Sequence, residues 1–162
     1  MSKTSSVPPL LRAALLGVLS GSRSATPLAV LALNHDVQEA RGRWQRWRLF
    51  RSPIGRGALV AAGVGELVGD KLPATPSRVG AGPLFGRAVS GAVAGIAMAG
   101  TGRPGTPVAA ALAGASGALV GSWLFYRARK AVVEKTGVPD VVVALVEDAV
   151  AISGSVAVVR SR

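Results

Sequence analysis

The sequence contains no cysteine and only one histidine, His35, among its 162 residues. Without cysteine the chain can form neither disulfides nor thiolate metal sites. A single histidine also excludes a zinc or haem site that depends on several imidazole ligands. We therefore expect no cofactor, and the sequence specifies no metal.

The sequence is also poor in charged and aromatic residues, which make up 17% and 4% of the chain. Soluble domains carry about 25% charged residues, and a soluble core with so few aromatic rings has little bulk to pack. Apolar residues instead account for 49% of the chain, with 21 glycines and a mean hydropathy of +0.42. This composition is typical of a membrane protein.

Acidic residues are scarce as well: there are 8 against 19 basic residues, which gives a net charge of +11. A strongly basic chain can bind nucleic acid, but here the charges cluster between long apolar runs. That pattern is typical of a membrane protein whose loops meet anionic headgroups. We expect a multi-pass protein of the cell membrane with no nucleic-acid partner.

Four apolar runs are close to the length of about 20 residues that a helix needs to cross a bilayer. They are residues 54–72, 83–100, 107–126 and 138–159. A fifth apolar region, 8–33, is interrupted by GSRS at 21–24 and by Pro27. It forms either one broken helix or two half-helices of a re-entrant hairpin, with a secretory signal peptide as the competing interpretation. The sequence thus predicts an all-α polytopic membrane helix bundle, a single domain over 1–162 with five or six membrane segments.

Small residues recur at helical spacing inside the predicted spans. Gly91 and Gly95 form a GxxxG motif, and the next run continues the pattern with Ala110, Gly114, Gly117 and Gly121. Membrane helices pack closely where such residues let their backbones approach. The pattern indicates a bundle and says nothing about activity; a homo-oligomer stays an open alternative.

The segment 41–56 combines arginines with tryptophans. Its six arginines are Arg41, Arg43, Arg46, Arg48, Arg51 and Arg56. Trp44 and Trp47 lie among them, as in a helix that rests on the membrane surface and contacts anionic headgroups. The alternative is a cytoplasmic loop that follows the positive-inside rule.

The chain contains a weak internal repeat. R-S-A-T-P-L-A at 23–29 matches R-P-G-T-P-V-A at 103–109, and Glu66 corresponds to Glu147. These matches predict two halves, 8–82 and 83–162. If each half crosses the membrane an odd number of times, the halves are inverted. The basic segments 41–56 and 127–135 then lie on opposite faces, with the first one inside.

Four acids interrupt the apolar runs. Glu147 and Asp148 lie near the middle of the last run, and Glu66 and Asp70 belong to the run at 54–72. An ionised carboxylate in the middle of a bilayer costs at least ~2.5–3.5 kcal/mol. Small residues share the helix faces of these acids, so we expect all four to point into the bundle as ion-binding or protonatable groups.

Few bases are placed to compensate them. Arg23, Arg87 and Lys71 are the candidates for counter-charges or gates. One interpretation is a set of structural ion pairs that fix the helix register, and for Asp70 and Lys71 an interfacial position is favoured. The other is a pathway for an ion or proton. Because four acids face two or three bases, the negative surplus favours binding of a cation or proton over ion pairing alone.

Four stretches carry a resemblance to a known family. They are GSRSATPLAVLA at 21–32, GELVGDKLPATPSR at 65–78, GPLFGRAVSGA at 82–92 and VEDAVAI at 146–152. With these the chain resembles the DUF4126 family of small bacterial integral membrane proteins, which implies a membrane location and no particular reaction.

The chain is more faintly similar to the UPF0016 cation/proton exchangers. Their motif is Glu, an apolar residue, Gly, Asp, Lys or Arg, then Thr or Ser. Here two residues separate Glu66 from Gly69, and Leu72 replaces the hydroxyl residue. The similarity implies a mechanism by analogy only.

The function expected from the sequence is a small membrane transporter or channel-like protein for an inorganic cation, coupled to protons. No nucleophile and base occur together, so no enzyme is expected. The alternatives are a non-transporting membrane scaffold with structural ion pairs and, third, an enzyme that acts on lipid.

Overall fold

The computed structural model describes residues 7–40, 42–69, 80–99 and 106–161, and every regular element in these ranges is a helix. The α-helices are α1 (Pro9–Ser22), α2 (Thr26–Leu33), α3 (Arg48–Arg51), α4 (Pro53–Gly69), α5 (Ala81–Met98), α6 (Thr106–Thr136) and α7 (Asp140–Arg160). The prediction of an all-α protein is confirmed.

Three of the described helices are long and apolar enough to cross a membrane. They are α5, α6 and α7, with 18, 31 and 21 residues. Helix α1 is apolar but has only 14 residues. Helix α4 has 17 residues, and the last part of the run predicted at 54–72 lies outside the described residues. These lengths and compositions indicate a membrane protein.

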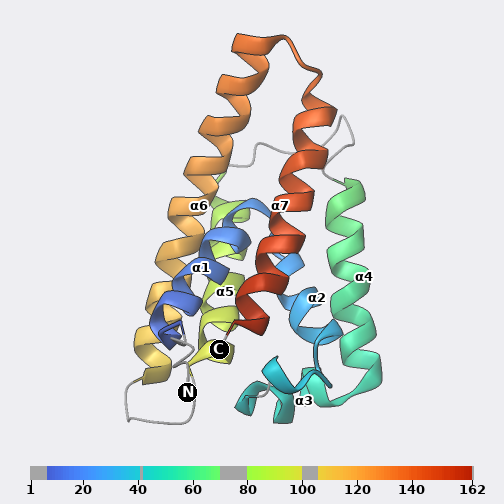
Figure 1. Cartoon of the computed structure of the whole chain (residues 1–162), viewed down its shortest axis with the longest axis vertical. Coiled ribbons are helices and arrows are strands. Elements are labelled where there is room, and N and C mark those ends of the chain that lie inside the picture. The colour runs from blue at the N-terminus through green and yellow to red at the C-terminus, as the bar shows by residue number, and fades with distance from the viewer. Residues whose placement is uncertain (1–6, 41, 70–79, 100–105, 162) are drawn as a thin grey trace, which may run out of the picture.

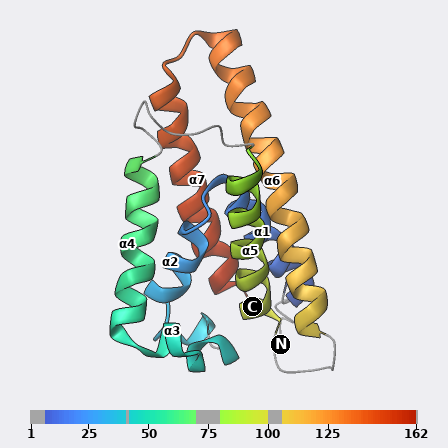
Figure 2. The ribbon, with the colours of Figure 1, turned by 180° about the vertical axis from the view of Figure 1, so that it is seen from behind.

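Helices α1 and α2 form a hairpin. Helix α1 ends at Ser22, Arg23 is extended (φ −139°, ψ 106°), and α2 begins at Thr26 with Pro27 in its first turn. Proline suits the first turn because its missing N–H has no helical partner there. Figures 1 and 2 show α1 and α2 running in opposite directions, with their connection deep in the molecule. Of the two alternatives for region 8–33, the structure has the pair of half-helices.

The remaining helices alternate in direction. Helix α4 runs away from the end of the molecule that carries α3, α5 returns to that end, α6 runs away and α7 returns (Figure 1). Helix α4 lies beside α2, while α1 packs against α5 and α6. Figure 2 shows α4 standing at the edge of the bundle. Its outer side therefore has little protein around it among the described residues.

The centre of the bundle depends on glycine. A Cβ added to Gly114 of α6 would lie 2.1 Å from the carbonyl oxygen of Gly91 on α5, and one on Gly17 of α1 would lie 2.2 Å from that of Gly114. Gly95 and Gly121 make similarly close backbone contacts. Helices α1, α5 and α6 can approach this closely only without side chains at these positions. The small residues found in the sequence are thus the contact faces.

Helix α6 is longer than the sequence indicated. The basic segment 127–135, expected to separate two membrane helices, forms the last turns of α6 instead. Good helix formers such as Ala, Lys and Glu occupy this segment, and the helix ends only where Gly137 adopts φ +67° before Pro139. The upper parts of α6 and α7 therefore extend beyond the other helices (Figure 1).

The segment 42–56 is not a single surface helix. A 3₁₀ turn at Arg43–Arg46, α3 and the start of α4 divide it. Trp44 is only 1% exposed, packs edge-on against Phe50 with ring centroids 5.0 Å apart, and donates its indole N–H to the Ala40 carbonyl (3.1 Å). The expectation that Trp44 lies among lipid headgroups is therefore wrong, because its ring is part of the core.

Candidate functional site: a buried charge network at the hairpin tip

Arg23 occupies the connection between α1 and α2 and is only 1% exposed. Its Nε and Nη2 atoms both lie 2.6 Å from Oδ1 of Asp148 on α7. Its Nη1 atom donates to the Ser22 carbonyl (3.2 Å) and lies 3.8 Å from Oε1 of Glu147. The guanidinium thus joins the tip of the hairpin to α7 through both acids predicted there.

The network continues from Glu147 to Asp140, the first residue of α7. Oε2 of Glu147 lies 3.5 Å from Nη1 of Arg129 on α6, and Nε of Arg129 donates to Oδ1 of Asp140 at 2.6 Å. Asp140 is the most exposed member, with 59% of its side chain accessible against 5% for Glu147. A line of charges therefore leads from the surface, through Arg129, to the buried hairpin tip.

Arg129 was not among the residues predicted from the sequence. It belongs to the basic segment 127–135, which was expected at one face of the membrane. The sequence does indicate its role if α6 is taken as one continuous helix. Arg129 then lies eleven residues after the buried Ala118 and seven after the buried Ser122, spacings that place all three on one helix face. The face that carries the small contact residues ends in this arginine.

Glu66 of α4 binds the same hairpin by a different route. Its Oε1 accepts hydrogen bonds from the backbone N–H and the hydroxyl of Ser24, both at 2.6 Å, and its Oε2 accepts one from the N–H of Ala25 at 2.8 Å. No side chain of the hairpin itself caps α2. The carboxylate satisfies donors that a helix start leaves unpaired and lies at the positive end of the helix dipole.

The other predicted residues are placed as follows. Arg87 is buried on α5, at 8% exposure. Ser90, one turn further along α5, donates its hydroxyl to the carbonyl of Ser24. Asp70 and Lys71 lie outside the described residues. The structure thus brings Arg23, Glu147 and Asp148 together, and Glu66 binds the two residues that follow Arg23.

The negative surplus expected from the sequence does not occur among the described residues. Two buried carboxylates, those of Glu147 and Asp148, accompany two buried arginines, and Glu66 and one further arginine are half-buried. The buried arginines are Arg23 and Arg87, and the half-buried one is Arg129. Asp70 and Lys71, which were part of that count, lie outside the described residues, and Arg129 adds a base that was not counted.

The described residues contain no group of three or more His, Cys, Asp or Glu side chains that could hold a metal ion. Among the described residues, three buried hydroxyls have no hydrogen-bond partner. They belong to Ser20 on α1, Thr26 on α2 and Ser155 on α7. Buried polar atoms without a protein partner are places where water or a polar solute can bind. The interior around the hairpin is therefore polar beyond its ion pairs.

The all-helical fold, its apolar helices and its buried charge network together define a class of small, helical membrane protein. The chain belongs to the family described as "Domain of unknown function (DUF4126)", whose model matches residues 10–161. The resemblance found in the sequence is thus confirmed. No curated protein and no solved structure matches the chain. The similarity to UPF0016 exchangers stays a prediction.

Proposed function

We propose that the chain is a multi-pass protein of the cell membrane built from two inverted halves. In Figure 1, α1, α2 and α4 run up, down and up, whereas α5, α6 and α7 run down, up and down. The middle helix of each half begins at a Thr-Pro pair, Thr26 in α2 and Thr106 in α6. The third helix of each half carries the glutamate, Glu66 or Glu147. Each helix is therefore antiparallel to its counterpart.

This arrangement corresponds to five or six membrane segments. Helices α4 to α7 cross the membrane, and α1 with α2 forms a re-entrant hairpin that enters and leaves on one side. The first half then crosses once and the second half three times. Both numbers are odd, as inversion requires. Helix α6, about 46 Å long from its 31 residues, exceeds the ~30 Å hydrocarbon core, so its basic end reaches the opposite face from α3.

Within this topology the charge network is the proposed site of a small cation transporter coupled to protons. The observation that carries the proposal is the position of Glu147 and Asp148, buried at the tip of a half-helix hairpin beside Arg23. Ionisable groups at membrane depth next to broken helices are typical of transport pathways. Protonation of either acid weakens its hold on Arg23 and so loosens the hairpin from α7.

The geometry favours a proton over a metal cation as the ion that Glu147 and Asp148 bind first. A proton neutralises one carboxylate and needs no further ligands. A metal cation needs several oxygens at once, and the described oxygens of Glu66 and Asp148 already accept hydrogen bonds. A cation therefore reaches Glu147 and Asp148 only when Arg23 moves away.

The alternative is a membrane scaffold whose ion pairs are structural. It is favoured by the short contact between Arg23 and Asp148 and by the equal numbers of buried acids and arginines. The two functions differ in their response to ions. Binding of a ligand to the folded state alone raises stability by about 2.7 kcal/mol at a hundred times its Kd, whereas a scaffold gains nothing from added ions.

Melting curves in detergent distinguish these functions. We expect Na⁺, K⁺, Mg²⁺, Ca²⁺ or Mn²⁺ to raise the Tm of the wild type in a pH-dependent way, and Glu147→Gln to remove that effect. Glu147→Gln leaves the contact between Arg23 and Asp148 in place, so the variant is expected to fold. Glu134→Gln, on the exposed end of α6, is the matched control. If no cation shifts the wild-type Tm at any pH, the scaffold is the better account.

A further inference from the structure

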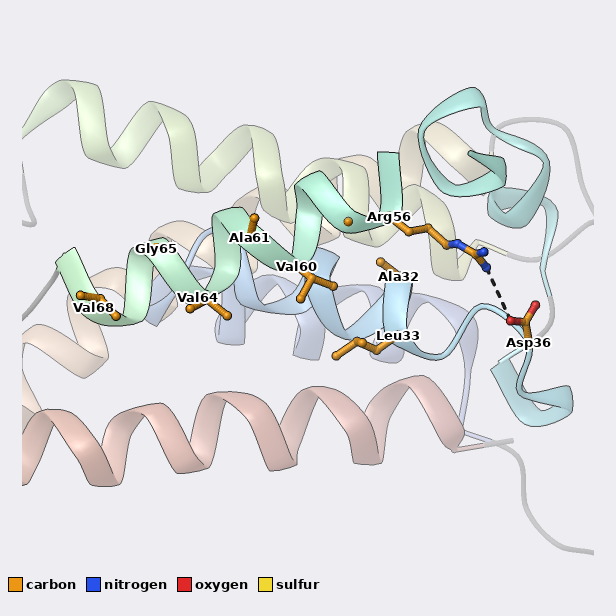
Figure 3. A pocket seen from close by; sticks show the side chains of 10 residues that line it. Ala32, Leu33, Asp36, Arg56, Val60, Ala61, Val64, Gly65 and Val68 are labelled. Atoms are coloured by element: carbon orange, nitrogen blue, oxygen red, sulfur yellow. Dashed lines mark ion pairs between the residues drawn. The ribbon is translucent and has the colours of Figure 1, made fainter. Parts of the chain in front are cut away.

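A cavity of about 860 Å³ follows α4 and the end of α2. Val60, Val64 and Val68 form a row along α4, and Leu33 of α2 lies near the end of the row (Figure 3). These side chains give the groove an apolar surface, and Val64 and Val68 are 55% and 59% exposed. An apolar groove of this kind on a membrane protein needs an apolar occupant.

Two glycines keep the groove open. Gly57 and Gly65 line it, and a Cβ added to either would have no heavy atom within 4 Å. From Arg56 to Val68 the helix rises about 18 Å. One leaflet of the hydrocarbon core is about 15 Å thick. The groove is therefore long enough to hold one acyl chain through its leaflet.

The groove ends in a basic cluster. Arg56 lines its end and pairs with Asp36 at 3.5 Å (Figure 3). A second cavity, of about 530 Å³, shares Asp36 with the groove and is lined by Arg46 and Arg51. Three arginines and one aspartate thus line the two cavities where they meet, which leaves a net positive charge where the apolar surface stops.

We propose that this groove binds one anionic phospholipid, with an acyl chain along α4 and the phosphate among Arg46, Arg51 and Arg56. Anionic headgroups are attracted to such clusters at the membrane surface. A second copy of the chain fits the groove less well, because it brings a net charge of +11 towards these arginines. The proposal depends only on the membrane location, so its failure leaves the role of the charge network untouched.

The first test removes the charges. Purified protein in detergent is titrated with phosphatidylglycerol or phosphatidylcholine, and bound lipid is counted by native mass spectrometry. We expect preference for phosphatidylglycerol, and about fivefold weaker binding for each arginine lost in Arg51→Gln/Arg56→Gln. Lys130→Gln/Lys135→Gln, at the far end of α6, is the matched control and keeps full binding. Asp36→Asn, which removes the competing carboxylate, strengthens binding.

The second test fills the groove. Gly65→Leu places a side chain where the acyl chain is proposed to lie, and its Cβ meets no heavy atom within 4 Å. We expect this variant to keep its fold and lose the bound phosphatidylglycerol. Gly86→Leu on α5, where the added Cβ also meets open space, is the control. Equal binding of both lipids, or unchanged binding by Gly65→Leu, overturns the proposal. A dimer that only Gly65→Leu dissociates identifies a second copy as the occupant instead.

Discussion

At the scale of single residues, Arg23 is the side chain on which the buried network depends. It contacts Asp148 at 2.6 Å and Glu147 at 3.8 Å, and it is almost completely buried. Removing one partner of a buried ion pair leaves the other charge without compensation. The cost is typically about 3–5 kcal/mol.

We therefore expect Arg23→Gln to lower the free energy of unfolding in detergent by about 3–5 kcal/mol. The double variant Arg23→Gln/Asp148→Asn is expected to recover part of that loss, since it removes the uncompensated acid as well. Arg48→Gln, at an exposed position of α3, is the control. Equal melting curves for Arg23→Gln and Arg48→Gln would show that the network contributes no stability.

His35 and Asp36 form a hydrogen-bonded pair outside the bundle that gives a pH-dependent prediction. The hydrogen bond between His35 Nδ1 and Asp36 Oδ1 (2.7 Å) holds the pKa of Asp36 below its ordinary value of 3.8. A lowered pKa in the folded state means that the contribution to stability is present above pH 3.8. It is lost as the pH falls through the lowered pKa.

His35→Ala is accordingly expected to return the pKa of Asp36 towards 3.8, as measured by NMR of its carboxyl carbon. Arg56→Gln removes a partner that lies further from Asp36 and lowers its pKa less, so it is expected to raise this pKa less. An Asp36 pKa that is the same with and without His35 contradicts the role assigned to the hydrogen bond.

The sequence identified part of this site and missed the rest for definable reasons. Arg23, Glu147 and Asp148 could be found because a charge within an apolar run needs compensation. The partners of Glu66 could not, since they are mostly backbone N–H groups, which every residue carries. Arg129 was missed because recognising it requires the correct end of α6.

At the scale of helices, the contact between α5 and α6 depends on the absence of side chains. A methyl group on Gly114 would meet the Gly91 carbonyl oxygen at 2.1 Å, a distance that real Cβ atoms do not tolerate. The backbones of the two helices must therefore separate if a side chain is added.

Gly114→Ala is expected to destabilise the protein by about 1–3 kcal/mol, the usual cost of overpacking. Gly82→Ala, where the added Cβ meets open space, is the comparison. If both alanine variants melt at the wild-type temperature, the helices are not packed as closely as the structure has them.

The helices themselves were predictable to different degrees. The break in 8–33 was visible in GSRS and Pro27, but the choice between a broken helix and a hairpin depends on tertiary contacts. The end of α6 was misplaced because basic residues suit both a loop and a solvated helix end. The structure has the helix end, since α6 continues to Thr136, and there Arg129 pairs with Asp140.

At the scale of the whole molecule, the proposed inversion places the two basic segments on opposite faces of the membrane. The chain has no cysteine, so single cysteines can be introduced at Arg48 and at Lys130, both exposed. An impermeant thiol reagent added to sealed cells is expected to label the Lys130→Cys protein and to spare the Arg48→Cys protein. Labelling of both from the same side contradicts the inverted arrangement.

The most direct test of the proposed function is proton movement through the purified protein in sealed vesicles. The vesicles contain a pH-sensitive dye, and a cation gradient or a membrane potential drives the flux. We expect wild-type flux well above that of protein-free vesicles. Glu147→Gln and Asp148→Asn are expected to reduce it to that background, while Glu134→Gln keeps it. Wild-type vesicles that never exceed the background, or Glu147→Gln vesicles that conduct like wild type, would contradict the account of Glu147 and Asp148 as its proton-handling groups.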